Sequence, residues 1–326
     1  MTAATITSLR QKHYNATVVY RNDANPDLMR IGIQADSPHT EIKSGQFVSL
    51  GLGRWEPRVA GTQIDHFDAT EAARVVNRAY SISCPMLGDV GPNNERLVPI
   101  EAAEILEFYI VLVRGDLNPT TTEPSPLLTP RLFHLRQGDR LKIGRKVTGA
   151  YTLDGVHPDH DVLMIGTGTG EAPHNAMTTR LLSQRHRGKI INVTTVRQNV
   201  DLAYTDTHDR LMRRHDNYHY LAMTTREPIN VDPNHPDFVG KRYVQNEFDS
   251  GRLAQRFGVD FDPGRTHVFL CGNPAMIGIP SRGEDTIAGD GMLQILARRG
   301  YRSHEELDRH AGETPGPGVV RFERYW

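Results

Sequence analysis

The sequence has few cysteines, almost no net charge and no long hydrophobic run. Only two residues are cysteine, Cys84 and Cys271, which argues against a disulfide framework and against a four-cysteine zinc or iron–sulfur site. Lysine and arginine total 38 against 39 aspartates and glutamates, so the chain lacks the basic excess typical of a nucleic-acid-binding protein. No stretch approaches the ~18 apolar residues of a membrane helix, and the first residues lack the apolar core of a signal peptide. We therefore expect a cytoplasmic protein with no membrane span and no nucleic-acid partner.

The length and a change of pattern near residue 155 predict two domains. A single hydrophobic core stops growing at about 250–300 residues, and this chain has 326. Before residue 155, short runs rich in β-branched and aromatic residues, such as "ATVVYRN" and "LEFYIVLV", alternate with turn clusters, which favours an antiparallel barrel or sandwich. After residue 160, apolar strands alternate with helical patterns, which indicates a doubly wound parallel sheet. We predict domains over residues 1–155 and 156–326.

The stretch "VLMIGTGTGEAP" is typical of a strand that enters a tight turn and then a helix. Its glycines are Gly166, Gly168 and Gly170, and Pro173 falls in the first helical turn, where its missing N–H would be unpaired anyway. A helix N-terminus behind bare backbone favours a pyrophosphate, which such folds bind at the carboxyl ends of their strands. As a lone motif the triplet is weak, and a tight turn without a ligand is the alternative interpretation.

The end of the next predicted strand bears on the choice of nucleotide. Folds that prefer NAD place an acidic residue there to bind the ribose 2′-hydroxyl. In "INVTTVRQN" that place is taken by Arg197, whose guanidinium fork suits a 2′-phosphate. One surface arginine at a strand end means little by itself, so the choice of nucleotide depends on whether further arginines join it.

One histidine pair has the spacing of metal ligands. His215 and His219 lie four residues apart, a spacing that could hold a metal. With 15 histidines in the chain and no third ligand nearby, chance explains the pair better, and we predict no metal site.

Four motifs together, in this order, resemble the ferredoxin–NADP reductase family, most closely its bacterial branch. They are "RAYS" (78–81), "GTGTGEAP" (166–173), "CGNP" (271–274) and the tail "RYW" (324–326). The resemblance covers nearly the whole chain. It implies a β-barrel domain that binds FAD, an α/β domain that binds NADP(H), and ferredoxin or flavodoxin as the electron partner of a monomeric enzyme.

The resemblance assigns flavin contacts to the first domain. Arg78 matches the arginine on the FAD pyrophosphate, Tyr80 the ring stacked on the isoalloxazine, and Ser81 the hydroxyl near flavin N5. The remaining residues implied to line the FAD are Ala79, Phe108, Tyr109, Val111 and Thr129.

In the second domain the resemblance adds Arg226 and Arg242 to Arg197 as a clasp for the 2′-phosphate. The residues implied to bind NADP are Gly166, Thr167, Gly168, Thr169, Gly170, Pro173, Arg197, Arg226, Arg242, Cys271, Gly272, Asn273 and Pro274.

The family also implies a flavin-covering tail. Tyr325 matches the penultimate tyrosine over the isoalloxazine, and Trp326 the ring on the adenine. Cys271 matches the cysteine beside the nicotinamide, and Glu323 is a candidate for proton supply. Ser81, Cys271, Glu323 and Tyr325 are the residues that we expect around the reaction centre.

The sequence departs from the family at Glu171, where an aliphatic residue is usual, and in three loops, 54–77, 85–104 and 117–127, which look longer than usual. A carboxylate suits a helix N-terminus but repels a nearby pyrophosphate, so we expect Glu171 to point aside. The alternatives are a reductase of free flavin, quinones or haem proteins, and an electron-transfer subunit of a larger complex.

Overall fold

The computed structural model describes residues 1–89, 95–114, 126–280, 286, 289–307 and 316–325. The chain forms two compact units. The first unit comprises Met1–Cys84 and Ile100–Ala150, and the second comprises Pro85–Pro99 and Tyr151–Trp326. The predicted loop 117–127 lies almost wholly outside the described residues.

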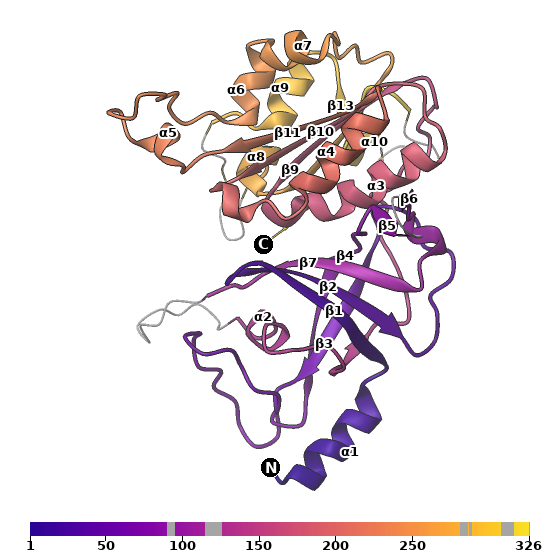
Figure 1. Ribbon diagram of the computed structural model, residues 1–326, viewed down its shortest axis with the longest axis vertical. Coiled ribbons are helices and arrows are strands. Elements are labelled where there is room, and N and C mark those ends of the chain that lie inside the picture. The colour runs from indigo at the N-terminus through magenta and orange to yellow at the C-terminus, as the bar shows by residue number, and fades with distance from the viewer. Residues whose placement is uncertain (90–94, 115–125, 281–285, 287–288, 308–315, 326) are drawn as a thin grey trace. The chain divides into compact units, whose positions relative to one another are not determined.

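The first unit is built on a six-stranded antiparallel sheet, in which Figure 1 labels β1, β2, β3, β4 and β7. The strand order is β4-β3-β8-β1-β2-β7. Ser83, just after β4, bridges to Glu107 on β7, and its N–H donates to the Glu107 carbonyl over 2.8 Å. This bridge joins the two ends of the strand order, so the sheet closes on itself and the predicted antiparallel class is confirmed. The strands are β1 (Ala16–Asn25), β2 (Leu28–Ala35), β3 (Phe47–Gly53), β4 (Val75–Ser81), β7 (Ile105–Val111) and β8 (Arg140–Ile143).

The helix α1 (Ala3–His13) precedes the sheet and was not predicted from the sequence. The Thr2 hydroxyl caps the helix by accepting a hydrogen bond from the Thr5 N–H. Basic residues occupy the last turn of the helix, where their positive charge interacts favourably with the negative end of the helix dipole. None of its side chains is buried, so it lacks the apolar stripe by which helices are recognised. Arg10 forms an ion pair with Glu56.

The other described elements of this unit are η1 (Ile100–Ala102) and α2 (Thr129–Leu132). The long loop that begins at residue 54 is held by two ion pairs: a buried one from Arg131 to Asp65 over 2.8 Å and a partly buried one from Arg54 to Glu71 over 3.0 Å. The predicted loop 85–104 instead contains a hairpin of β5 (Leu87–Asp89) and β6 (Glu95–Leu97), which belongs to the second unit.

The second unit has a six-stranded parallel sheet in the order β11-β10-β9-β12-β14-β13. Its strand order reverses at β9, as in a doubly wound fold, so this prediction is confirmed. The strands are β9 (Asp161–Thr167), β10 (Ile190–Val196), β11 (Tyr218–Thr224), β12 (Thr266–Gly272), β13 (Arg302–Ser303) and β14 (Val319–Arg324). The helices are η2 (Gly168–Gly170), α3 (Glu171–Ser183), η3 (Asn199–Asp201), α4 (Thr205–Arg214), α5 (Pro228–Val231), α6 (Val244–Asp249), α7 (Arg252–Phe257), α8 (Pro274–Ile277), α9 (Met292–Arg298) and α10 (His304–Leu307).

The two faces of this parallel sheet differ in chemistry. The face under α6, α7, α8 and α9 is an apolar core that includes Ile165, Val193 and Leu270 (Figure 1). Because side chains alternate along a strand, the residues between these face α3 and α4 instead. The fully buried polar residues on that side include Glu171, His174, Asn175, Thr178, Thr179, Asn192, Thr194 and His208.

No helix among the described residues is long and apolar enough to cross a membrane.

Candidate functional site

The glycine stretch forms a strand–turn–helix unit at the carboxyl end of β9. Gly168 has φ +54°, which a side chain would strain, and a Cβ added there would meet nothing within 4 Å. The turn therefore combines a backbone that requires glycine with open space above it. Helix α3 begins directly after the turn at Glu171, so its N-terminus lies behind the bare backbone as anion binding requires.

The same turn interlocks with the end of β12. A Cβ on Gly170 would lie 2.3 Å from the Cys271 carbonyl oxygen, and one on Gly272 would lie 2.3 Å from Thr167 Oγ1. The Thr167 hydroxyl accepts from the Asn273 N–H over 2.7 Å. The glycines of "GTGTG" and "CGNP" thus have a packing role as well as the predicted binding role. Thr169 is half-buried in the turn and Pro173 is buried in α3.

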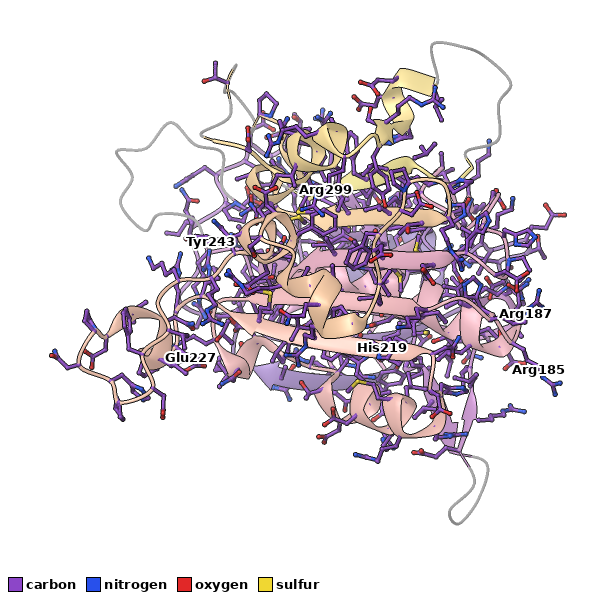
Figure 2. The ribbon with its side chains drawn as sticks, turned by 90° about the horizontal axis from the view of Figure 1, so that it is seen from above. Arg185, Arg187, His219, Glu227, Tyr243 and Arg299 are labelled. Atoms are coloured by element: carbon purple, nitrogen blue, oxygen red, sulfur yellow. The ribbon has the colours of Figure 1, made fainter. Side chains whose placement is uncertain are left out.

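Two of the predicted arginines lie together at the carboxyl edge of the sheet. Arg197 follows β10, Arg226 follows β11, and the Arg226 N–H donates to the Arg197 carbonyl over 2.8 Å. Both side chains are exposed, and neither forms an ion pair with another residue in the described part of the chain. Figure 2 shows Glu227, the neighbour of Arg226, and Tyr243 at one edge of the sheet and Arg187 at the opposite edge.

Arg242, the third arginine, is exposed just before α6. A hydrogen bond from Arg252 lowers the pKa of Glu247, and the charge of Arg242 lowers it further by a smaller amount. A cationic cluster at the ends of β10 and β11 suits a phosphate ester.

Cys271 and Glu323 lie level with Gly166 on adjacent strands. Cys271 pairs in register with Gly166 on β9 and with Glu323 on β14. Burial raises the pKa of the Cys271 thiol, a hydrogen bond from Tyr325 opposes this, and the Glu323 carboxylate adds to the rise. Burial also raises the pKa of Glu323, against the charge of Arg324, which favours a carboxyl group that holds its proton more tightly than in water.

The tail continues β14 past this group. The Tyr325 N–H donates to the Gly272 carbonyl over 3.0 Å, and Asn273 caps α8 by accepting from the Ala275 N–H over 2.9 Å, with Pro274 next in the chain. The structure therefore brings Cys271, Glu323 and Tyr325 together. Trp326 lies outside the described residues.

The "RAYS" residues form the second half of β4, which pairs with β3. Tyr80 pairs with Val48 and Arg78 with Leu50 on β3, so these two side chains share one face while Ala79 and Ser81 face the other way. Arg78 and Ala79 are exposed, Tyr80 is half-buried and Ser81 is buried. The Arg78 guanidinium donates to the neighbouring Asn77 carbonyl over 2.8 Å, which leaves several of its five donors for an anion.

The remaining predicted flavin residues lie on β7 and α2. Tyr109 is buried, Val111 is 44 % exposed, and Phe108 is fully buried on the opposite face. The Thr129 hydroxyl accepts from the Val113 N–H over 3.1 Å, so its own proton is directed elsewhere, as a phosphate contact requires.

A cavity of about 580 Å³ lies away from all these residues, at the amino ends of the parallel strands. Its lining mixes Asp159, Asp260 and Asp262 with Arg187 and Arg265. Since doubly wound sheets bind ligands at the carboxyl ends of their strands, this cavity is not the nucleotide site. No cluster of three or more metal-ligating side chains occurs among the described residues.

Sequence reasoning missed two partners of Glu171. His208 Nε2 lies 3.0 Å from Glu171 Oε1, and the Tyr220 hydroxyl donates to the same oxygen over 2.9 Å. Neither residue lies near the glycine turn in the sequence, and no local pattern marks them.

Comparison with known proteins agrees with this geometry. Residues 164–281 match the family model described as the oxidoreductase NAD-binding domain. A ferredoxin–NADP reductase of Pseudomonas aeruginosa is 28 % identical over 250 residues, which is 74 % of this chain and 77 % of the relative. A flavodoxin/ferredoxin–NADP reductase of Escherichia coli is 25 % identical over 242 residues, 74 % of this chain and 78 % of the relative.

Among solved structures, a ferredoxin NADP+ reductase of Neisseria gonorrhoeae with bound FAD and NADP has a TM-score of 0.65 and 19 % identity, and the match covers 96 % of this chain and 99 % of that one. An antiparallel barrel joined to a parallel sheet with a glycine turn defines the chain as a two-domain, nucleotide-dependent oxidoreductase. Within that class the chain is similar to ferredoxin–NADP reductases of bacteria.

Proposed function

We propose that the protein is an FAD-dependent ferredoxin (flavodoxin)–NADP+ reductase. It exchanges a hydride between NADP(H) and FAD, and single electrons between FAD and ferredoxin or flavodoxin. The observation that carries the proposal is the cationic edge beside an open glycine turn, formed by Gly168, Arg197 and Arg226. The names of the relatives support the same activity.

In this proposal the first unit binds FAD. Arg78 binds the pyrophosphate, Tyr80 stacks on the isoalloxazine, and Ser81 and Thr129 donate hydrogen bonds. The exposure of Arg78 and the donors that Arg78 and Thr129 have available fit such a cofactor. FAD, when bound, supplies the exchange between two-electron and one-electron transfer, while the protein orients it.

The second unit binds NADP(H). The turn and the N-terminus of α3 bind the pyrophosphate, and Arg197, Arg226 and Arg242 bind the 2′-phosphate. Cys271 bounds the nicotinamide pocket, Glu323 holds a proton near it, and Tyr325 covers the flavin until the nicotinamide displaces it. Burial of Cys271 and the raised pKa of its thiol fit a residue that shapes the pocket rather than one that attacks covalently.

The test is to purify the protein and record its visible spectrum. We expect a yellow protein with one FAD that oxidises NADPH and reduces ferredoxin or flavodoxin. Colourless protein that does not take up added FAD contradicts the proposal.

The choice of acceptor separates this proposal from the alternatives. Rates with ferredoxin and flavodoxin are compared with those for free flavin, a quinone and a haem protein at equal concentrations. A clear preference for one of the latter three identifies a different kind of reductase. We further propose a cytoplasmic monomer, which gel filtration and cell fractionation test.

A further inference from the structure

Glu171 is a fully buried carboxylate at the first residue of α3, directly behind the glycine turn. Its Oε1 accepts a hydrogen bond from Tyr220 over 2.9 Å and a longer one from Thr194 over 3.4 Å, and it lies 3.0 Å from His208 Nε2. These three partners come from β11, β10 and α4. One oxygen atom therefore links the start of α3 to three other elements.

The partners of Glu171 are themselves held in place. His208 Nδ1 lies 2.7 Å from the Tyr218 hydroxyl, and the His208 ring stacks on Tyr220 with centroids 3.7 Å apart. Burial and the nearby carboxylate raise the pKa of Tyr220, so its hydroxyl remains a donor. The His208 and Tyr220 rings are therefore each held both by a polar contact with Glu171 and by stacking on each other.

A carboxylate at this place is costly in two ways. Removing it from water is unfavourable unless it is paired and hydrogen-bonded, and if it turned toward the crevice it would repel a pyrophosphate. An aliphatic residue would avoid both costs. Buried polar networks do, however, fix the relative positions of the elements that they join.

The joined elements are those that carry the two halves of the nucleotide site. Tyr220 lies on β11, which leads to Arg226, and Thr194 lies on β10, which leads to Arg197. Glu171 begins the helix behind the pyrophosphate turn. The β10–β11 ladder fixes the two arginines relative to each other. The β9–β10 ladder ends at the Thr167–Thr195 pair, so the start of α3 lies beyond it, and the Glu171 hydrogen bonds add a direct link from α3 to β10 and β11.

We propose that Glu171 is a positioning residue that sets the separation between the pyrophosphate turn and the 2′-phosphate arginines. The inference rests on the proposed NADP site. A ligand that spans both places is sensitive to that separation, and a ligand that binds at one of them is not.

The test compares NADP+ with 2′-AMP, which carries the 2′-phosphate but no pyrophosphate. Dissociation constants are measured by calorimetry on the FAD-loaded protein for the wild type, Glu171→Leu and Glu171→Gln. For Glu171→Leu we expect NADP+ to bind about tenfold more weakly, or about 1.4 kcal/mol, with 2′-AMP changed less than about twofold. Glutamine keeps the shape and the acceptor oxygen, so Glu171→Gln should restore NADP+ affinity to within about threefold of the wild type.

A matched pair of tyrosine variants covers the case in which Glu171→Leu does not fold. Tyr220→Phe removes one donor to Glu171, and the control Tyr301→Phe removes one buried hydrogen bond, to the Phe261 carbonyl over 2.8 Å, elsewhere in the same unit. We expect only Tyr220→Phe to weaken NADP+, by about two- to fivefold, without a change for 2′-AMP.

Three results would overturn the inference: NADP+ affinity unchanged in folded Glu171→Leu or in Tyr220→Phe, equal weakening of NADP+ and 2′-AMP, or no recovery in Glu171→Gln. Failure of the wild type to bind NADP+ at all would instead contradict the proposed function.

Discussion

At the residue scale, Arg226 is the side chain on which the choice between NADPH and NADH most directly depends. Its backbone N–H donates a hydrogen bond to the Arg197 carbonyl at the carboxyl edge of the sheet, and its side chain is exposed there. A charged hydrogen bond contributes about 1.5–3 kcal/mol, and exposure reduces that figure. We predict that Arg226→Ala raises the KM for NADPH about tenfold and the KM for NADH far less, as steady-state kinetics will measure.

Arg185 provides the control, since it is also exposed but lies at the opposite edge of the sheet (Figure 2). Arg185→Ala should leave the ratio of the two KM values as in the wild type. Equal weakening of both nucleotides by Arg226→Ala would place that guanidinium away from the 2′-phosphate.

Residue chemistry was predictable where a local pattern carried it. The glycine turn, Arg197 and the "CGNP" turn were all identified from strand ends, and the structure places each at the carboxyl edge of the sheet. The partners of Glu171 were not predictable, because His208 lies 37 residues away in the sequence and their pairing depends on tertiary packing.

At the scale of single elements, α3 and β12 each bury a histidine that makes the folded protein less stable at acidic pH. Burial lowers the pKa of His174 to about 3, and burial together with Arg321 and neighbouring histidines lowers that of His267 to about 3. The unfolded state takes up these protons below its ordinary pKa of about 6.5. The neutral rings therefore contribute full stability above pH 6.5, and that stability is lost as the pH falls from 6.5 toward 3.

We predict that each histidine removes about 2 kcal/mol from the free energy of unfolding between pH 6.5 and 5. Scanning calorimetry across this range should show a steep decrease in melting temperature. His267→Gln should reduce the slope by one proton, whereas His66→Gln, at an exposed position, should not. An unchanged slope in His267→Gln would mean that the ring is charged in the folded protein.

The elements themselves were predicted well where periodicity was strong. The strands of both sheets follow apolar runs in the sequence. The prediction of an antiparallel sheet followed by a parallel, doubly wound sheet was therefore confirmed. The helix α1 escaped because it has no buried face, and the β5–β6 hairpin because its strands have three residues each, too few for an alternating pattern.

At the scale of the whole molecule, the last residues connect the chemistry of both units in the proposed function. Tyr325 is tied to Gly272 and Cys271, and the family resemblance places its ring on the flavin. An aromatic contact contributes about 0.5–1.5 kcal/mol beyond burial. Removing Tyr325 and Trp326 should therefore weaken FAD binding about 2- to 12-fold, alter the flavin spectrum and improve the use of NADH relative to NADPH.

Titration with FAD and steady-state kinetics with both nucleotides measure these effects. Phe238→Ala, which removes another exposed aromatic side chain, is the control and should change none of the three. A shortened chain with the wild-type FAD affinity, spectrum and nucleotide ratio would show that the tail does not act at the flavin.

The chemical difference between the two faces of the parallel sheet also determines which substitutions this chain can accept during evolution. The apolar face can accept single substitutions, because aliphatic residues of similar volume replace one another with little loss of folding stability. The polar face cannot, since loss of one member leaves a buried group unsatisfied. We therefore expect substitutions at Glu171, His208 and Tyr220 to be coupled, so that replacing Glu171 by an aliphatic residue favours replacing its partners as well.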